Sequence, residues 1–181
     1  MTLALTPHPD TPCDAIARIE VNLARSRPAG LALRYVVTGD IAALRLPPLL
    51  ERARADDLWR ETCLEAFLRK ADGPGYYEFN LSPSNRWAAY GFDGYREGMA
   101  APAGVALTHL TQRTDGRLYE MVATLDLVGL PGLPADEAWR LGLSAVIEEA
   151  SGRKSYWALA HAPGKPDFHH PDAFAFDLEQ P

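Results

Sequence analysis

One short stretch near the end of the chain concentrates side chains that could do chemistry. Residues 155–171, SYWALAHAPGKPDFHHP, hold three of the five histidines of the chain, one aspartate and three prolines. Imidazole and carboxylate groups are common zinc ligands, and a histidine near an aspartate can also transfer protons. The stretch is therefore a candidate metal site, proton-transfer centre or ligand-binding loop.

The spacing within this stretch favours a stiff loop over a metal site. A metal ion would be held by His161, Asp167 and His169, with His170 as a further candidate ligand, and this spacing matches no recognised ligand pattern. The adjacent His169 and His170 would point to opposite faces of an extended segment. No activated serine or cysteine accompanies a histidine–aspartate pair. Because the prolines fix backbone angles, we rank a structural role first, ligand binding second and metal binding third.

A second polar cluster lies on two segments that we expect to pair. TCLEAFLRK (62–70) and YYEFNLS (76–82) alternate in polarity and are separated by a Gly/Pro turn, which predicts a β-hairpin. Folding the hairpin about residues 72–73 places Glu65 opposite Asn80, and it places a phenylalanine opposite Glu78. In this register Glu65, Glu78 and Asn80 share one face with a serine.

The predicted polar face suits a polyhydroxylated ligand. A second turn at residues 82–85 brings RWAAYGF alongside, and Trp87 could fall on the same face. Carboxylates, an amide and an aromatic ring together can bind the hydroxyl groups and the apolar face of a sugar. The alternative is a solvated outer sheet face. Glycoside hydrolysis needs two acids about 5–10 Å apart across a cleft, and neighbours on a flat strand pair do not straddle a substrate.

The length and composition of the chain indicate one globular domain, residues 1–181. The sequence has 47% hydrophobic and 23% charged residues. A net charge of −6 weighs against nucleic acid and an anionic membrane as partners. No apolar run approaches the roughly 20 residues of a spanning helix, and the start lacks the basic region of a signal peptide. The two cysteines fit no metal or disulfide pattern, so we expect a cytoplasmic protein with reduced thiols.

Alternation with a period of two dominates the chain and predicts strands. It runs through residues 16–23, 31–37, 76–82, 118–127 and 139–147, between turns rich in Gly, Pro, Asn and Asp. Helical patterns are short, about two turns over residues 47–59 and about one turn over residues 134–139. We therefore predict an all-β protein, an antiparallel β-sandwich of jelly-roll or immunoglobulin-like type with one or two short helices.

Three segments resemble bacterial DOMON-like proteins, which belong to the same broad group as family 9 carbohydrate-binding modules. They are RADDLWRETCLEAFL, YYEFNLSPSNRWAAYGFDGYREGM and SYWALAHAPGKPDFHHPDAFAFDL. The six-residue spacing from Trp59 to Glu65 resembles the entry strand of that group. The YWAL-H-PDFH pattern is the part that is specific to the DOMON-like proteins.

The resemblance implies a β-sandwich whose sugar-binding relatives hold a sugar between two aromatic rings, while other relatives bind haem. It implies Trp59 as one ring and Glu65 as a hydroxyl acceptor, and Trp87, Trp157 and Phe168 compete for the second ring. From its own strand pattern, Trp157 is predicted to lie in the core. Haem would need axial ligands such as Met99 and His109, whose spacing does not support a haem site.

Single residues sharpen these expectations. Trp59 follows two aspartates in a loop-like context and is expected to be exposed or to cap the core, while Cys63 is expected to be a buried thiol. Arg96 follows an Asp-Gly turn and could bind a carboxylate, sugar hydroxyls or a neighbouring acid in its own loop.

The sequence thus predicts a non-enzymatic domain that binds a carbohydrate or a sugar-containing metabolite, with no cofactor and no metal. The predicted site combines nine residues: Trp59, Glu65, Glu78, Asn80, Trp87, Arg96, His161, Asp167 and His169. One alternative is a sugar-acting hydrolase or isomerase with Glu65 or His161 as general base. The other is a module whose partner is a protein.

Overall fold

The computed structural model describes residues 1–181 and is built almost wholly of strands. The strands are β1 (Thr2–Pro7), β2 (Ile16–Ser26), β3 (Gly30–Gly39), β4 (Ala53–Arg54), β5 (Cys63–Lys70), β6 (Tyr76–Leu81), β7 (Arg86–Phe92), β8 (Ala106–Thr114), β9 (Leu118–Asp126), β10 (Trp139–Glu148), β11 (Lys154–Ala158) and β12 (Phe176–Leu178). Three single-turn 3₁₀ helices complete the chain: η1 (Ile41–Ala43), η2 (Leu58–Arg60) and η3 (Pro171–Ala173). No helix is both long and apolar enough to cross a membrane.

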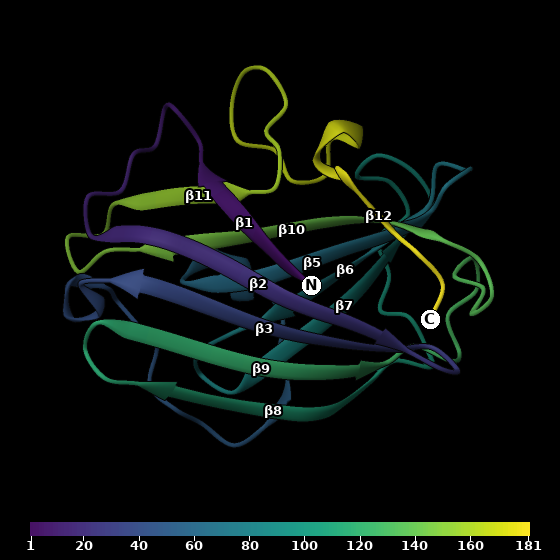
Figure 1. Ribbon diagram of the computed structural model, residues 1–181, viewed down its shortest axis with the longest axis horizontal. Coiled ribbons are helices and arrows are strands. Elements are labelled where there is room, and N and C mark those ends of the chain that lie inside the picture. The colour runs from purple at the N-terminus through teal and green to yellow at the C-terminus, as the bar shows by residue number, and fades with distance from the viewer.

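The strands form two facing layers that β1 joins along one side (Figure 1). Layer A has the strand order β1-β2-β3-β9-β8, and layer B has the order β4-β7-β6-β5-β10-β11. The first part of β1 pairs with β2 and its last two residues pair with β11. The short strand β12 pairs with β10. One continuous curled sheet therefore supplies both layers.

The predicted all-β, sandwich-like class is confirmed, but the sheet is mixed because β4 runs parallel to β7. All other pairs are antiparallel. The jelly-roll or immunoglobulin-like connectivity stays a prediction.

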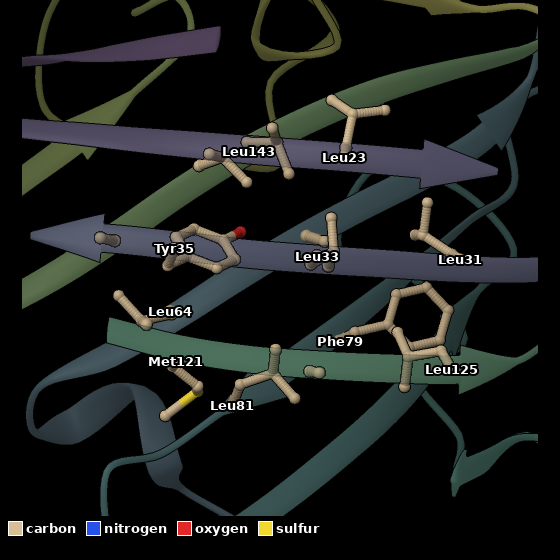
Figure 2. Close-up of a cluster of buried hydrophobic side chains, with 14 of the residues drawn as sticks. Leu23, Leu31, Leu33, Tyr35, Leu64, Phe79, Leu81, Met121, Leu125 and Leu143 are labelled. Carbon is tan, nitrogen blue, oxygen red and sulfur yellow. The ribbon is translucent and has the colours of Figure 1, made fainter. Parts of the chain in front are cut away.

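The main core lies between the layers and follows from the alternation seen in the sequence. Leu31, Leu33 and Tyr35 of β3 point into it from layer A, and Leu64 and Phe79 point into it from layer B (Figure 2). The Tyr35 hydroxyl donates a 2.6 Å hydrogen bond to the backbone carbonyl of Glu65, which ties the two layers together. A buried hydroxyl with a partner avoids the cost of an unmet polar group.

The predicted hairpin is confirmed in its exact register. β5 and β6 pair with Glu65 opposite Asn80 and with Phe67 opposite Glu78. Strand residues alternate between faces, so the apolar neighbours of these residues enter the core and the polar residues lie on the outer face of layer B. The hairpin therefore has one core face and one outer face, and the outer face carries the site described below.

The two predicted helices are wrong, because most residues of both segments lie in loops and a few pair in the sheet. Within residues 47–59, β4 extends the edge of layer B and only η2 begins a helical turn. In the segment 134–139, Trp139 is fully buried as the first residue of β10, opposite Lys70 of β5. Local helix propensity is a weak preference that tertiary pairing overrides.

The outer face of layer B is partly covered by the C-terminal segment 159–178. Phe168 and Phe174 of this segment pack on Phe67 of β5 and Tyr76 of β6 in a second, smaller apolar cluster. Figure 1 shows the segment passing beside β10 and ending in β12. The covering segment stops short of the whole face, and a cavity lies beside it.

Candidate functional site

A cavity of about 540 Å³ opens on the outer face of layer B. Its walls come from β5, β6, β7, β10 and β11 and from three loops that are far apart in the sequence. The lining residues are Asp56, Asp57, Trp59, Glu65, Glu78, Tyr90, Phe92, Arg96, Met99, Val146, Tyr156, Pro166, Phe168 and His169. A volume in the range of about 300–1,000 Å³ is typical of small-molecule sites.

The mouth of the cavity carries Trp59, whose surface is 49% exposed. Its loop is fixed from two sides. The Tyr90 hydroxyl donates a 2.7 Å hydrogen bond to Asp56, and Lys154 Nζ donates to the backbone carbonyl of Arg60 at 2.5 Å. Asp57 adopts a left-handed backbone conformation (φ 63°) at the start of η2. The exposed indole is therefore presented by an anchored loop.

Two buried glutamates form the floor. Glu65 is 2% exposed and Glu78 is 5% exposed. Ser144 Oγ donates to Glu65 Oε2 at 3.2 Å, and Asn80 Nδ2 donates to Glu78 Oε1 at 2.7 Å. Glu65 Oε1 is buried and has no hydrogen-bond partner in the protein. One carboxylate oxygen of the floor thus lacks a hydrogen-bond partner within the protein.

Burial controls the charge of this floor. It raises the pKa of Glu65 well above its ordinary value, and the nearby charge of Glu78 raises it further. Burial also raises the pKa of Glu78, against the opposing effects of the Asn80 amide and of the Arg96 charge. A carboxylate held away from water favours its protonated form, and two close carboxylates reinforce that preference.

His169 stands beside Glu78 and is held by Tyr76. The Tyr76 hydroxyl accepts the backbone N–H of Arg96 at 3.1 Å and lies 2.7 Å from His169 Nδ1. Because that ring nitrogen is the acceptor available to the hydroxyl proton, we assign the imidazole proton to Nε2. Burial lowers the pKa of His169 to about 4, so the ring is neutral near pH 7. Its Nε2 lies 3.8 Å from Glu78 Oε2.

An ion pair links two loops at the side of the cavity. Arg96 Nη2 donates to Asp167 Oδ1 at 2.8 Å, and the Tyr95 hydroxyl donates to the other oxygen of the same carboxylate. Burial alone would raise the pKa of Asp167, but the hydrogen bonds from Tyr95 and Arg96 hold it below its ordinary value. Asp167 Oδ1 also accepts the backbone N–H of His169 at 3.1 Å. This pair therefore positions the loop that carries His169.

The structure brings together most of the predicted site. Five of the nine residues line the cavity: Trp59, Glu65, Glu78, Arg96 and His169. Two more lie directly behind the lining, because Asn80 binds Glu78 and Asp167 binds Arg96. Their role in ligand binding stays a prediction.

The placement of Trp87 on this face is wrong. Trp87 pairs with Leu81 of β6, so both side chains point to the core side of layer B. The indole packs against the main core and is absent from the cavity lining. Trp157 is also buried in the main core, as its strand pattern predicted, and Phe168 is the competitor for a second ring that does line the cavity.

The placement of His161 near the other site residues is also wrong. Its ring packs against His8 with a 4.9 Å centroid distance, and its Nε2 lies 2.9 Å from the backbone carbonyl of Thr6. His170 caps η3 by accepting the backbone N–H of Asp172. No three His, Cys, Asp or Glu side chains in the chain gather as metal ligands. The three histidines of residues 155–171 therefore lie in three different environments.

Two further residues can be placed. Cys63 is fully buried, as predicted, and burial raises the pKa of its thiol well above the ordinary value. Met99 lines the cavity, but His109 lies on β8 in layer A, so the two cannot act as a pair of haem ligands.

Sequence reasoning missed several aromatic walls. Tyr90 and Phe92 alternate on β7 and share the outer face with the polar residues of β6. Tyr156 neighbours the core residue Trp157, so strict alternation alone assigns it to the outer face. Tyr156 could therefore have been found from the predicted burial of Trp157, whereas Tyr90 and Phe92 follow the same turn that led to the wrong placement of Trp87. Asp56 and Asp57 had no such signal, because they sit in a loop.

Comparison with known proteins identifies the fold. No protein-family model and no curated protein sequence matches the chain. The structure is similar to a candidate carbohydrate-binding protein from Bacteroides uniformis, with 14% identity and a TM-score of 0.65, over 96% of this chain and 83% of that one. At this identity the similarity concerns the fold alone.

Weaker similarity extends to a family 9 carbohydrate-binding module from Caldicellulosiruptor kristjanssonii. Its glucose complex matches with 11% identity and a TM-score of 0.44, over 90% of this chain and 84% of that one. Its cellotriose complex matches with 12% identity and a TM-score of 0.39, over 81% and 75%.

Proposed function

We propose that this chain is a non-enzymatic binding domain for a carbohydrate or a sugar-containing metabolite. The observation that carries the proposal is the cavity on layer B, which combines an exposed indole at the mouth with buried carboxylates at the floor. Sugars present apolar ring faces that stack on aromatic side chains and hydroxyl groups that need paired hydrogen-bond partners. Both kinds of partner converge in this cavity.

The floor offers a mixed set of hydrogen-bond groups. Glu65 Oε1 is unpartnered, and the gap of 3.8 Å between Glu78 Oε2 and His169 Nε2 is too long for a hydrogen bond. A hydroxyl group can donate to a carboxylate while it accepts from a neutral histidine, which suits the ambivalent chemistry of a sugar hydroxyl. Trp59 would supply the stacking surface above this floor.

Two finer assignments belong to the same proposal. We assign the chain to the DOMON-like group related to family 9 carbohydrate-binding modules, on the three sequence segments and on the similarity of its fold to the candidate carbohydrate-binding protein from Bacteroides uniformis. We also propose that the protein works in the cytoplasm with reduced thiols, because its two cysteines are free.

The paired glutamates favour a sugar-acting hydrolase as the second candidate. Their raised pKa values suit acid–base work. A glycosidase, however, places its two acids on either side of the scissile bond, whereas Glu65 and Glu78 sit on neighbouring strands of one floor. Binding is therefore the better supported function. Release of a chromophore from aryl glycosides, lost in Glu65→Gln, would reverse this ranking.

The proposal is tested by a thermal-shift screen of mono- and oligosaccharides, followed by calorimetry of the hits. A ligand that binds only the native state stabilises it by about 2.7 kcal/mol at a hundredfold excess over Kd. We expect Trp59→Ala to weaken sugar binding by about tenfold or more while leaving the melting temperature of the free protein nearly unchanged, since the indole is half exposed.

Val128→Ala is the matched control, because Val128 is exposed and lies outside the cavity lining. It should bind sugars like the parent protein. A flat response to the whole sugar panel would contradict the proposal. Sugar binding that survives unchanged in Trp59→Ala would move the site away from the cavity mouth.

A further inference from the structure

We propose that the ligand of this cavity carries a positively charged amino group, which binds at Glu65 and Glu78 beneath the aromatic walls. The inference rests on the proposed function, because it assigns the charge of the carbohydrate that the same cavity would hold. The chemical class is an amino sugar with a free ammonium group, as opposed to a neutral or N-acetylated sugar.

The first argument is the balance of charge around the cavity. Four carboxyl side chains line it, whereas Arg96 is its single lysine or arginine. The guanidinium of Arg96 is already paired with Asp167, which lies behind the lining. His169 adds no positive charge near pH 7, because burial keeps its ring neutral. Carboxyl groups therefore outnumber the positive groups in the lining. Burial favours the protonated form of the two floor carboxyls in the free protein, and an ammonium group bound there would favour their ionised form, with release of a proton.

The second argument is that the carboxyl groups at the mouth have a cationic partner and those at the floor do not. At the mouth, Asp56 is paired with Arg54 at 2.9 Å and Asp57 with Arg60 at 3.3 Å. At the floor, Glu65 forms no ion pair, and the partner of Glu78 is the neutral His169 at 3.8 Å. Charged groups that are almost fully buried are costly unless they are paired. The floor is thus the place where a positive group would gain most.

The third argument is the unpartnered oxygen. Glu65 Oε1 is buried, makes no hydrogen bond and belongs to a residue that lines the cavity. Ser144 already binds the other oxygen, and the backbone carbonyl of Glu65 is taken by Tyr35. An ammonium group brings three donors and a full charge, so one group could serve Glu65 Oε1 and Glu78 Oε2 together.

The walls complete a cage suited to a cation. Trp59, Tyr90, Tyr156 and Phe168 line the cavity around the acidic floor. The faces of aromatic rings attract ammonium groups through their quadrupoles, and the effect grows when the cation is removed from water. A neutral sugar would use the same rings for stacking but would leave the two buried carboxyl groups without a charge partner.

The test is calorimetric titration at about pH 6.5, where an amine of ordinary pKa is protonated. Glucosamine and galactosamine are compared with glucose and galactose, and with their N-acetyl derivatives, which keep the nitrogen but lose its charge. We expect the free amino sugars to bind about tenfold or more tightly than both uncharged sets. Methylammonium is included as a cation that keeps the N–H donors and is not a sugar.

Glu65→Gln tests the placement, because it removes the ability of the side chain to ionise and keeps its size. It should weaken binding of the amino sugar by about tenfold and change binding of the neutral sugars by less than about twofold. Asp57→Asn is the matched control, since it removes a lining carboxylate that already has an arginine partner. Its effect should stay below about threefold.

The outcomes separate this inference from the proposed function. Neutral sugars that bind as tightly as amino sugars would overturn the inference and leave the carbohydrate function standing. Binding of methylammonium without any sugar would support the cation site and contradict the carbohydrate function. Equal losses in Glu65→Gln and Asp57→Asn would overturn the placement at the floor, and no binding at all would overturn both.

Discussion

The two faces of the β5–β6 hairpin serve opposite purposes although they alternate along the same residues. The core face, with Leu64, Phe79 and Leu81, is fully buried among apolar neighbours from layer A. The outer face buries Glu65 and Glu78 with one carboxylate oxygen unpartnered and with the neutral ring of His169 beside Glu78 at 3.8 Å. The core face stabilises the fold, whereas the outer face buries polar groups that are only partly hydrogen-bonded. Unmet polar groups of this kind are typical of functional sites.

The largest expected difference separates two neighbours on β6. Phe79→Ala should lower the free energy of unfolding by about 3–5 kcal/mol, because it opens a cavity in the main core. Glu78→Gln, one position away, should change it by less than about 1 kcal/mol, because the new amide oxygen can still accept from Asn80. Urea denaturation at pH 7 measures both. Similar losses in the two variants would contradict the division of the hairpin into a stabilising and a functional face.

The next effect concerns the pH dependence contributed by His169. Its pKa is lowered to about 4 in the fold, whereas an unfolded histidine titrates near about 6.5. Between these values the unfolded chain binds the extra proton, so this residue makes the protein less stable as the pH falls from about 6.5 to about 4. The full loss is up to about 3 kcal/mol, estimated at 1.36 kcal/mol per pKa unit.

The measurement is the unfolding free energy of the parent protein and of His169→Gln across that pH range. The unfolding free energy of the parent should fall relative to that of His169→Gln as the pH falls. A constant difference would show that the ring is not held neutral, and it would weaken the assignment of its proton to Nε2.

The smallest expected effect has the opposite sign. Because the pKa of Glu65 is raised, the folded carboxyl holds its proton better than the unfolded one. Its contribution to stability is therefore present at low pH and is lost as the pH rises above the unfolded value of about 4.3. Glu65→Gln removes this loss, so the variant should become more stable than the parent as the pH rises, by about 1–2 kcal/mol near pH 8.

Thermal unfolding of the two proteins from pH 5 to pH 8 checks this expectation, with Asp57→Asn as the exposed control. A variant that is less stable than the parent at every pH would indicate that Glu65 makes a favourable structural contact beyond Ser144. That result would contradict the inference that the buried carboxyl group of Glu65 lowers the stability of the fold.

Strand parity explains how much of the site could be predicted from the sequence. The register of β5 and β6 followed from alternation and one Gly/Pro turn, so Glu65, Glu78 and Asn80 were correctly placed on one face. Trp87 lies beyond a second turn, where Ser82 pairs with Arg86 and Asn85 takes a left-handed conformation. One residue more or less in such a turn moves every following side chain to the other face. The alternation of faces along β6 could therefore not be extended through this turn to β7.

The cavity itself was beyond reach for a different reason. It exists because the loop with Trp59, the loop with Arg96 and the segment with His169 meet over layer B, and nothing in a strand pattern specifies how loops converge. The same limit explains His161, which shares the Pro-rich stretch with His169 but turns towards His8. Composition and alternation predict faces and layers, while loop geometry depends on contacts distant in sequence.

The position of β1 has a consequence for self-association. Its six residues cover the edge of β2 with their first part and the edge of β11 with their last two, so one short segment shields two strands. If β1 detached, β2 and β11 would each present a row of unpaired backbone groups, which are templates for pairing with other chains. By covering these two strand edges, β1 therefore protects the protein against aggregation, whether or not a ligand occupies the cavity.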